Sequence, residues 1–334
     1  MPQVPTARPV AVYGAGGHTG RFVSAELQRR GLAVVAVGRS RVSLPADVTH
    51  RVAAIADPWA LLEAFSGCGV VINCAGPFLD TAVPVIEAAI GVGASYIDVS
   101  AEQASAMDAF ERFDAPARDA GVAVIPAAGF YGGLADLLAT ALIGPQGDGH
   151  DLTVAIALDR WWPTEGTRKT GERNTVPRLV VDDHRLVPMP LPAAASTWTF
   201  GAPHGEQAMV ELPFSEVITI SRHLRARSVR AHLTRAALDD IRDATTAPPT
   251  STDATGRSAQ RFEMVVEARH GESVRRAVAC GQDIYAVSAP LVVEAAVRLM
   301  RQDFGRSGAL ALGQAFDASD FLAALSPQPL SVTF

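Results

Sequence analysis

The chain has 334 residues, of which 48% are hydrophobic and 19% charged, so it can bury a sizeable core and is not a disordered protein. Its net charge of −6 argues against a protein that binds nucleic acid through bulk positive charge. The three cysteines, Cys68, Cys74 and Cys280, form no Cys-x-x-Cys pair, which argues against a disulfide scaffold or a zinc ribbon.

The first part of the chain alternates apolar, β-rich runs with helical patterns. The predicted strands are Pro9–Tyr13, Ala33–Val37, Arg51–Ile55, Val70–Cys74, Ser95–Val99 and Val122–Ile125. The predicted helices are Thr19–Arg30, Pro58–Phe65, Val83–Ile90, Glu102–Ala120 and Gly133–Leu142. Because parallel strands need crossover helices, these repeated β-α units predict a doubly wound parallel sheet in an α/β domain of the Rossmann type.

After about residue 150 the strands alternate more loosely and suit an open mixed or antiparallel sheet. They are predicted at Leu152–Leu158, Arg178–Val181, Glu216–Ile220, Arg261–Arg269 and Ser273–Gly281. Arg222–Ile241 is predicted to be helical, Thr245–Ser258 to be a surface loop, and Ala286–Arg301 to be a strong amphipathic helix. We therefore expect a second, α+β domain that begins near residue 141 and follows a nucleotide-binding domain of residues 1–140.

Lys169, the only lysine, limits the available chemistry. Glu165 stands four residues before it, so the Tyr-x-x-x-Lys pair is absent, and no Gly-Lys-Ser/Thr follows a glycine-rich loop. The N-terminus lacks a basic region followed by an apolar stretch, and glycines and a proline interrupt the most apolar window, Val122 to Leu142. We expect a soluble, cytoplasmic protein with no membrane span.

The strongest motif is Gly14-Ala15-Gly16-Gly17-His18-Thr19-Gly20, between the first predicted strand and the first helix. Such glycines permit a tight turn and let the backbone approach a pyrophosphate, which the exposed N–H groups of the helix N-terminus bind. The alternative is an ordinary glycine-rich turn. The position of the motif favours dinucleotide binding by Gly14, Gly16, Gly17, His18, Thr19 and Gly20.

The choice of cofactor is made at the end of the second strand, where a carboxylate holds the ribose of NAD and arginine accommodates the phosphate of NADP. This chain has Gly38-Arg39-Ser40-Arg41 and no carboxylate there. Arg39, Ser40 and Arg41 therefore favour NADP(H) through charge-assisted hydrogen bonds to a 2′-phosphate. The alternative is a solvated basic turn.

Asn73-Cys74-Ala75-Gly76-Pro77-Phe78 ends the fourth strand, where ligands of open α/β sheets lie. The turn should border the nicotinamide end of the cofactor. Cys74 could be a nucleophile if a base lowered its pKa. Small neighbours and the lack of a histidine nearby in sequence favour a packed cysteine beside the cofactor.

Polar and aromatic residues follow the next two strands. Asp98 and Glu102 could orient a substrate or move a proton, although Asp98 could equally hold the strand end, with Ser100 as a helix N-cap. Tyr131, in Gly129-Phe130-Tyr131-Gly132-Gly133, is a candidate contact for nicotinamide or substrate, and a core aromatic is an equal alternative. Tyr131 and Asp98 are thus the candidate catalytic residues.

Gly14–Gly20, Gly38–Arg41, Asn73–Phe78, Tyr96–Glu102 and the Gly129–Asp136 turn together resemble the saccharopine dehydrogenase (saccharopine reductase)-like NADP-binding family. The resemblance covers residues 8–140 well, and Gly166-Thr167 and Tyr285–Leu299 match loosely. It implies NADPH-linked hydride transfer to a C=N bond or, in relatives called trans-acting enoyl reductases, to a C=C bond. It also implies an inserted second domain, residues 141–284, and a segment of residues 285–334 whose helix packs back on the Rossmann domain.

The second domain offers candidate substrate contacts. Trp161 and Trp162, followed by Arg168 and Lys169, could form an aromatic wall with cationic anchors for a carboxylate. A capped loop with one exposed tryptophan is an equal alternative. The substrate contacts are then predicted to be Trp161, Trp162, Arg168, Lys169 and Glu102.

Two further patterns favour structural roles. The arginine run from Arg222 to Arg235 is typical of a solvated helix face balanced by Asp239, Asp240 and Asp243, so no nucleic-acid partner is expected. The scattered histidines predict no metal site.

The leading hypothesis is an NADPH-dependent reductase whose small-molecule substrate lies in a cleft between the domains. The alternative is a non-catalytic NADPH-binding sensor or scaffold, in which Phe78 or Tyr131 would block the nicotinamide; an open pocket walled by Trp161 and Trp162 would count against it. The open sheet of the second domain could also pair two copies of the chain in a homodimer.

Overall fold

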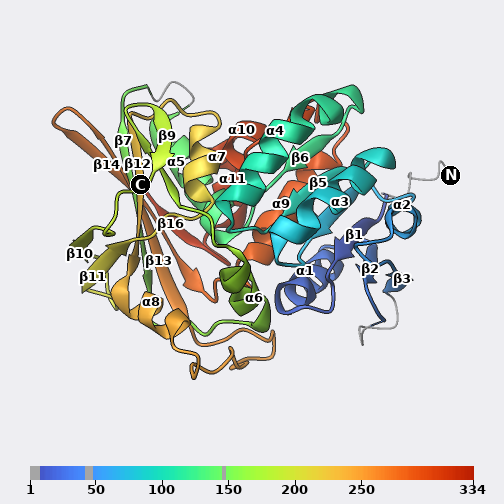
Figure 1. Cartoon of the computed structure of the whole chain (residues 1–334), viewed down its shortest axis with the longest axis horizontal. Coiled ribbons are helices and arrows are strands. Elements are labelled where there is room, and N and C mark those ends of the chain that lie inside the picture. The colour runs from blue at the N-terminus through green and yellow to red at the C-terminus, as the bar shows by residue number, and fades with distance from the viewer. Residues whose placement is uncertain (1–7, 42–47, 145–147) are drawn as a thin grey trace.

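Two β-sheets lie side by side in the computed structural model, which describes residues 8–41, 48–144 and 148–334 (Figure 1). The first is parallel throughout, with strand order β15-β6-β5-β4-β1-β2-β3. Its strands are β1 (Val10–Tyr13), β2 (Val34–Gly38), β3 (Thr49–Val52), β4 (Val70–Asn73), β5 (Ser95–Asp98), β6 (Ala123–Ile125) and β15 (Gly308–Ala309). The predicted doubly wound parallel sheet is confirmed.

Helices cover both faces of this sheet. They are α1 (His18–Arg29), α2 (Pro58–Phe65), α3 (Phe78–Gly91), α4 (Gln103–Asp119) and α9 (Ser288–Leu299). Because side chains alternate along a strand, Val10 and Val12 of β1 pack with α1 and α9, whereas Ala11 and Tyr13 pack with α2, α3 and α4. All four are buried, as expected for a parallel strand covered on both sides.

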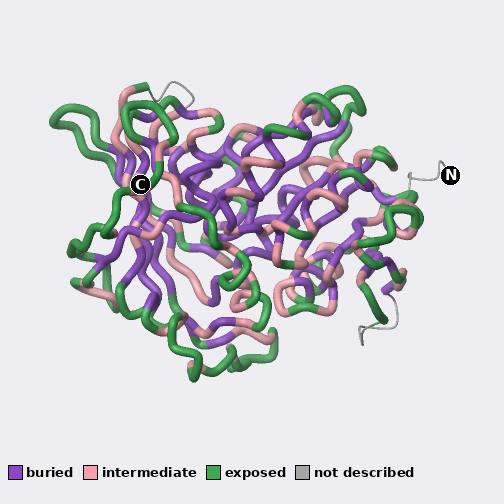
Figure 2. The backbone as a smooth tube through the Cα atoms, viewed as in Figure 1, coloured by how far each residue is buried: buried purple, intermediate pink, exposed green. Residues whose placement is uncertain are grey.

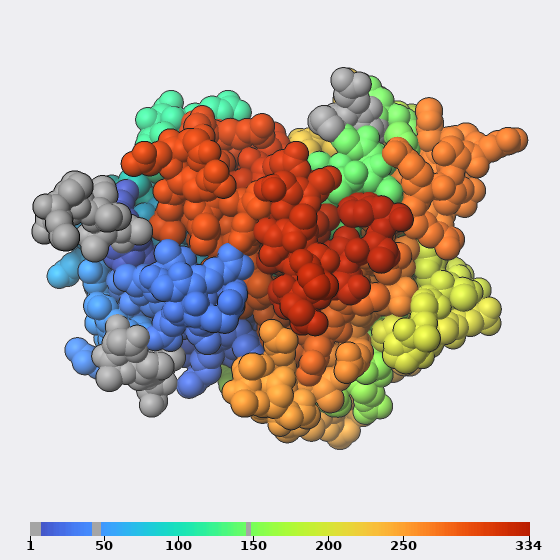
Figure 3. Space-filling model, turned by 180° about the vertical axis from the view of Figure 1, so that it is seen from behind, coloured from blue at the N-terminus to red at the C-terminus, as the bar shows by residue number. Residues whose placement is uncertain are grey.

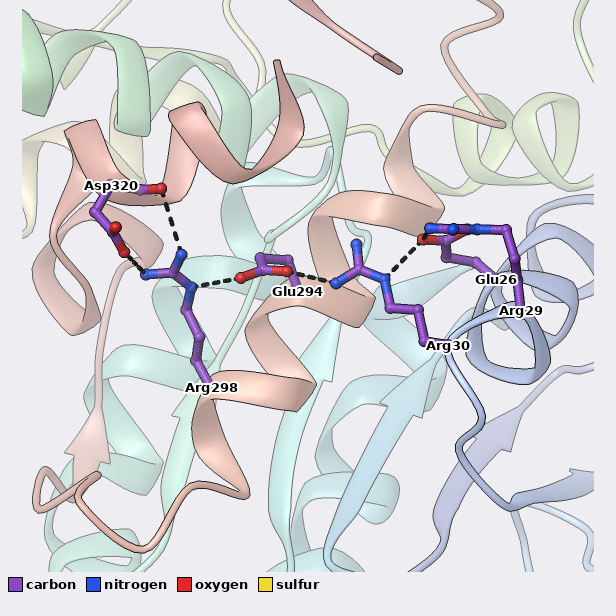
Figure 4. Close-up of polar contacts among 6 residues, drawn as sticks. All are labelled: Glu26, Arg29, Arg30, Glu294, Arg298 and Asp320. Atoms are coloured by element: carbon purple, nitrogen blue, oxygen red, sulfur yellow. Dashed lines mark hydrogen bonds and ion pairs between the residues drawn. The ribbon is translucent and has the colours of Figure 1, made fainter. Parts of the chain in front are cut away.

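Helix α9 packs against α1, as the family resemblance predicts. An ion-pair chain joins the two helices (Figure 4): Arg30 Nε lies 2.8 Å from a Glu26 carboxylate oxygen, and Arg30 also pairs with Glu294 of α9. Arg298 continues the chain, 2.7 Å from Glu294 and 2.7 Å from Asp320 of α11 (Ala318–Leu325). The chain ties the C-terminal helices to the first helix of the sheet.

The second sheet is mixed, with order β10-β11-β12-β7-β13-β14-β16 and a β8–β9 hairpin that pairs with β12. Only β12 and β7 pair in parallel among its described strands. The strands are β7 (Asp151–Leu158), β8 (Leu179–Asp182), β9 (Arg185–Pro188), β10 (Ala195–Thr199), β11 (Glu206–Glu211), β12 (Ser228–Thr234), β13 (Arg261–His270), β14 (Ser273–Gln282) and β16 (Ser331–Thr333). This agrees with the predicted α+β domain.

The remaining helical segments lie between and around the sheets. They are a π-helical turn at Phe130–Leu134, α5 (Ala135–Ile143), α6 (Glu165–Arg173), α7 (Glu216–Ser221), α8 (Arg235–Arg242) and α10 (Leu312–Ala315). Helix α5 packs on β13 and β14 and so joins the first domain to the second sheet. Figure 2 shows this central region buried and the tip of the β13–β14 hairpin exposed.

The C-terminal segment joins both sheets. Strand β15 pairs with β6 in the first sheet, and β16 pairs with β14 in the second. Seen from behind, the C-terminal residues fill the junction between the N-terminal helices and the second sheet (Figure 3). No helix in the described parts of the chain is long and apolar enough to cross a membrane.

Two predictions in the second domain are wrong. Glu216–Ile220 is not a strand but most of α7, because a short helix buried on nearly all sides carries the same β-branched residues as a strand. Arg222–Ile241 is not one helix: it contains β12, in which buried Val229, Ala231 and Leu233 alternate with less buried residues, and then α8. Arg230 and His232 stand between them, and the arginines on either side of the strand masked this period of two.

The arginine run from Arg222 to Arg235 is therefore not a solvated helix face, and its ion-pair partners differ from the expected Asp239, Asp240 and Asp243. Arg222 pairs with Asp114 at 3.4 Å, Arg225 with Asp148 at 3.3 Å, and Arg230 with Glu211 at 3.2 Å. Arg227 pairs with Asp151. These carboxylates come from distant segments, so sequence proximity could not identify them.

Smaller differences concern element boundaries. Helix α3 begins at Phe78 rather than Val83, because Pro84 lies inside the helix instead of near its start. Strand β3 covers Thr49–Val52 rather than Arg51–Ile55. The predicted loop Thr245–Ser258 has no regular secondary structure.

Candidate functional site

A cavity of about 710 Å³ lies where the two domains meet. Its first-domain wall consists of turns that follow β1, β2, β4, β5 and β6, so it opens outside the carboxyl ends of the parallel strands. Residues of α6, of the segment before β8 and of the loop after α8 form the second-domain wall. Open α/β sheets bind their ligands at this edge.

The turn after β1 forms a cradle for a phosphate. Gly14 has a φ of +82°, and a Cβ there would lie 2.9 Å from that of Ala75, so neither the turn nor the space accepts a side chain. A Cβ on Gly20 would lie 2.2 Å from the Gly14 oxygen, which shows how closely α1 approaches the turn.

The N-terminus of α1 is available to an anion. Its N-cap is Gly17, no side chain caps it, and its first turn carries no acidic residue. The first amide to bond back into the helix is that of Arg21, which donates to the Gly17 carbonyl, so earlier amides can face a ligand. The residues present fit the pyrophosphate of a dinucleotide. The cavity is lined by Gly14, Gly16, Gly17, His18 and Thr19. Gly20 does not line the cavity and instead packs against the backbone of Gly14.

The turn after β2 places one arginine at the cavity. Arg39 lines it, is exposed, and forms no ion pair with any described residue. Its charge acts on Tyr13, whose pKa burial nevertheless raises. Ser40 and Arg41 are exposed neighbours that do not line the cavity in this conformation. The free guanidinium of Arg39 fits a phosphate ester.

The turn after β4 borders the same cavity. Cys74, Ala75, Gly76 and Phe78 line it, whereas Asn73 and Pro77 do not. Asn73 instead holds the turn: its Oδ1 accepts from the Ala75 amide at 3.0 Å, and its Nδ2 donates to the Tyr96 hydroxyl at 3.2 Å. Burial and the nearby Asp98 raise the pKa of the Cys74 thiol far above its usual range, so the residue fits a packed cysteine rather than a thiolate.

Glu102 lines the cavity but has two structural partners. Its carboxylate accepts from the Phe78 amide at 2.7 Å and from the Leu79 amide at 3.1 Å, and so caps the N-terminus of α3. Burial raises its pKa. The side chain sets the position of Phe78 in the cavity wall.

Asp98 is fully buried and does not line the cavity. Its Oδ1 accepts from the amides of Ser100 at 2.8 Å and Ala127 at 2.7 Å, and its Oδ2 accepts from the Tyr96 hydroxyl at 2.9 Å. Burial raises its pKa to about 6. These contacts match the strand-end alternative, in which Asp98 holds the ends of β5 and β6 together. Ser100 is not the N-cap of α4; Glu102 is, and the Ser100 hydroxyl accepts from the Glu102 amide.

Tyr131 lies on the π-helical turn and lines the cavity within an aromatic group. Its ring centroid lies 4.2 Å from that of Phe214 and 6.0 Å from that of Trp161. Its hydroxyl is buried and has no hydrogen-bond partner among the described residues. Burial raises its pKa well above 10.0, so the hydroxyl keeps its proton and can donate to a ligand.

Tyr285 organises the opposite wall. Its hydroxyl accepts from Trp161 Nε1 at 3.0 Å, lies 2.9 Å from the Thr167 hydroxyl, and donates to the Trp162 carbonyl at 3.3 Å. Trp161 is 3% exposed and lines the cavity, whereas Trp162 does not. Of the two tryptophans predicted to form an aromatic wall, only Trp161 therefore lines the cavity.

The two predicted cationic anchors have other partners. Arg168 donates to the carbonyls of Asp243 at 3.2 Å and Thr246 at 2.7 Å, and it does not line the cavity. Lys169 lines the cavity, but its Nζ lies 2.5 Å from the Glu165 carboxylate. Both residues thus stabilise α6 and the loop next to it.

The structure adds residues that sequence reasoning missed, above all Arg178, Phe214 and Tyr285 in the cavity wall. A helix-start signal, Pro213 followed by Ser215, was available near Phe214. Arg178 and Tyr285 had no local signal, because their neighbours in the cavity come from distant segments. His18 also lines the cavity, with its Nε2 buried and unpartnered and its ring against Tyr285. No potential metal-binding cluster occurs within the described ranges.

A parallel sheet with a glycine cradle after its first strand, closed by a second sheet domain, is the arrangement in which open α/β folds hold dinucleotides. Residues 10–125 match the family model described as "Saccharopine dehydrogenase NADP binding domain", and the N-terminal domain of this chain belongs to that family.

Curated relatives match the N-terminal part of the chain. The human "Saccharopine dehydrogenase-like oxidoreductase" is 32% identical over 152 residues, which is 38% of this chain and 35% of the relative. A "Lipid droplet localized protein" of Caenorhabditis elegans is 34% identical over 146 residues, covering 38% and 34%. A "Putative trans-acting enoyl reductase" of Mycobacterium tuberculosis is 26% identical over 160 residues, covering 42% and 37%. The matches thus span only about a third of the relatives' length.

Two solved structures share the fold across nearly the whole chain. Apo saccharopine dehydrogenase (L-Glu forming) of Saccharomyces cerevisiae has a TM-score of 0.65 at 11% identity, covering 98% of this chain and 100% of that one. The DAP dehydrogenase of C. glutamicum, solved with DAP, has a TM-score of 0.51 at 14% identity, covering 97% of each. At these identities the likeness concerns the fold alone.

Proposed function

We propose that this chain is an NADP(H)-dependent oxidoreductase that transfers a hydride between the cofactor and a C=N or C=C bond of a small molecule. The proposal rests mainly on one cavity, which joins the glycine cradle and Arg39 to the aromatic wall at Tyr131 and Trp161. The family of the N-terminal domain and the oxidoreductase names of its relatives support it.

Each part of the cofactor has a place in this proposal. The amides at the start of α1 hold the pyrophosphate, and Arg39, assisted by Ser40 and Arg41, holds the 2′-phosphate. Gly76 and Phe78 border the nicotinamide end. This arrangement favours NADPH over NADH because no carboxylate follows β2 to hold the ribose hydroxyls of NAD.

NADPH would supply the hydride when bound, and the chain would position the substrate, exclude water and supply a hydrogen-bond donor. Trp161 and Phe214 are buried aromatic residues that keep water from the reacting bond. The Tyr131 hydroxyl retains its proton and can donate a hydrogen bond to the substrate nitrogen or oxygen. Reduction of a protonated imine needs little beyond such positioning, which fits a site without an obvious catalytic dyad.

The sensor alternative requires that side chains block the nicotinamide. Phe78 and Tyr131 do line the cavity, but its volume of about 710 Å³ is within the range of ligand sites and leaves room beside them. The volume and the aromatic wall at Trp161 favour the reductase.

Parallel fluorescence titrations with NADPH and NADH test the proposal. We expect NADPH to bind at least about tenfold more tightly, as one charge-assisted contact implies. Screening imines, enoyl thioesters and ketones for NADPH oxidation then identifies the reduced bond. If neither cofactor binds, the proposed function is wrong.

A further inference from the structure

Arg178 is a cavity residue with a fixed backbone. It immediately precedes β8, whose first residue, Leu179, is held by Gln103 of α4. The Leu179 amide donates to Gln103 Oε1 at 2.7 Å, and Gln103 Nε2 donates to the Leu179 carbonyl at 2.9 Å. This pair of bonds links the second domain to the start of α4 and places the arginine in the cavity wall.

The charge of Arg178 has no countercharge within ion-pair distance in the described structure. Its Nη1 donates to the Pro213 carbonyl, and its guanidinium lies over the Phe214 ring at 4.7 Å. Burial lowers its pKa, although the more distant Glu216 opposes this. A partly buried guanidinium without an ion pair among the described residues is costly for a folded protein, and an anionic ligand would reduce that cost.

The part of the cavity next to this guanidinium has an aromatic wall. Phe214 contacts both Arg178 and Tyr131, and Trp161 completes the aromatic group. The Tyr131 hydroxyl is buried and has no partner in the part of the chain that the structure describes. Such a surface suits an organic anion with an apolar body, because the rings cover the body and the guanidinium binds the head.

The position of Arg178 separates it from the cofactor phosphates. Arg39 follows β2, whereas Arg178 is held at the start of α4, the helix that follows β5, and β1 and β4 lie between β2 and β5 in the sheet. The phosphate cradle follows β1. The guanidinium therefore faces the end of the cavity that the nicotinamide and the substrate would share under the proposed function.

We propose that Arg178 binds the carboxylate of an organic-acid substrate whose apolar part lies against Tyr131, Trp161 and Phe214. This inference rests on the proposed function and narrows its substrate class. A guanidinium can hold a carboxylate through two parallel N–H···O bonds, which a lysine cannot reproduce.

Binding of simple carboxylates in the presence of saturating NADPH tests the inference. Hexanoate and phenylacetate are compared with hexanamide and phenylacetamide by ligand-observed NMR and calorimetry on the full chain. We expect each acid to bind at least about tenfold more tightly than its amide, and Arg178→Gln to remove this preference. Arg178→Lys should retain part of it. Arg185→Gln, at an exposed arginine of β9 outside the cavity, is the matched control.

The possible outcomes separate the two proposals. If NADPH binds the wild type but the acids do not, or if Arg178→Gln leaves acid binding unchanged, the carboxylate role is overturned and the proposed function stands. A selective loss of NADPH affinity in Arg178→Gln also overturns it, because the arginine would then contact the cofactor. If NADPH itself fails to bind the wild type, the proposed function is wrong. Thermal unfolding of each variant distinguishes loss of the site from loss of the fold, and Arg178→Lys supplies a second variant.

Discussion

The Ser288 hydroxyl at the start of α9 accepts a hydrogen bond from the Phe130 amide at 3.1 Å, across 158 residues of sequence. The same hydroxyl donates to the Ile284 carbonyl at 3.0 Å. Since Phe130 begins the π-helical turn that carries Tyr131, this contact sets the position of a candidate active-site residue from the C-terminal segment.

Replacing Ser288 with alanine should therefore destabilise the protein. The substitution leaves the buried Phe130 amide without a partner, which costs about 1–3 kcal/mol in the free energy of unfolding. Denaturant unfolding measures this change, and Ser273→Ala on the exposed β13–β14 hairpin serves as control. Equal stability of Ser288→Ala and the wild type would contradict the structural role.

The ion-pair chain between α1 and α9 should also contribute to stability. Glu294 contacts both Arg30 and Arg298, and its side chain is only 12% exposed, so Glu294→Gln leaves two partly buried guanidinium groups without their shared anion (Figure 4). We expect a loss of about 1–3 kcal/mol in denaturant unfolding. Glu206→Gln, at an exposed position of β11, should have almost no effect. Similar values for the two variants would show that the chain contributes little.

The buried carboxyl of Glu216 should make a contribution to stability that falls as pH rises. Its carboxyl is fully buried, one of its oxygens lacks a partner within the described ranges, and burial raises its pKa from 4.5 to about 7. The folded state then holds the proton more tightly than the unfolded state, so this group lowers stability as pH rises from 4.5 through about 7. The full effect is on the order of 3 kcal/mol.

Glu216→Gln removes this titration. Unfolding free energies measured from pH 4 to pH 8 should therefore decline less steeply with pH in the variant than in the wild type. Glu206→Gln should keep the wild-type slope. If Glu216→Gln also keeps the wild-type dependence of unfolding free energy on pH, Glu216 does not contribute to that dependence.

Cys74 should behave as an inert thiol. Burial and Asp98 raise its pKa, so iodoacetamide should label it slowly at neutral pH, as mass spectrometry of the labelled peptide can show. Cys74→Ala should retain NADPH binding. Rapid alkylation of Cys74 at pH 7 would instead restore the nucleophile hypothesis.

Arg39→Ala should weaken NADPH binding by about tenfold or more and leave NADH binding nearly unchanged, because only NADPH carries the 2′-phosphate. Arg185→Ala, another exposed arginine without an ion pair in the described structure, controls for the loss of charge. Equal losses for both cofactors in Arg39→Ala would refute the specific contact with the 2′-phosphate.

Local patterns predicted the first domain well. Buried strands such as Val10–Tyr13, the glycine turn and the amphipathic α1 are encoded within short windows, so period and turn chemistry locate them. The candidate cofactor residues followed from that placement, since the motif marks the strand end at which ligands of this fold lie.

The second domain was harder to predict, because contacts between residues far apart in the sequence determine its structure. Helix α7 contains Val217, Ile218 and Ile220, which favour a strand locally but pack as a buried helix. Arg178, which lies 36 residues before Phe214, meets it only after β8 pairs with β12. No spacing rule connects such residues, so Tyr131 and Trp161 could be predicted as cavity residues from the sequence, whereas Arg178 and Phe214 could not.

The most direct test of the account is a crystal structure of the chain with NADP⁺. We predict that the pyrophosphate lies at the N-terminus of α1, the 2′-phosphate within hydrogen-bond distance of Arg39, and the nicotinamide ring between the Gly76–Phe78 turn and Tyr131. A cofactor bound elsewhere, or a nicotinamide ring directed away from Tyr131 into solvent, would contradict the account.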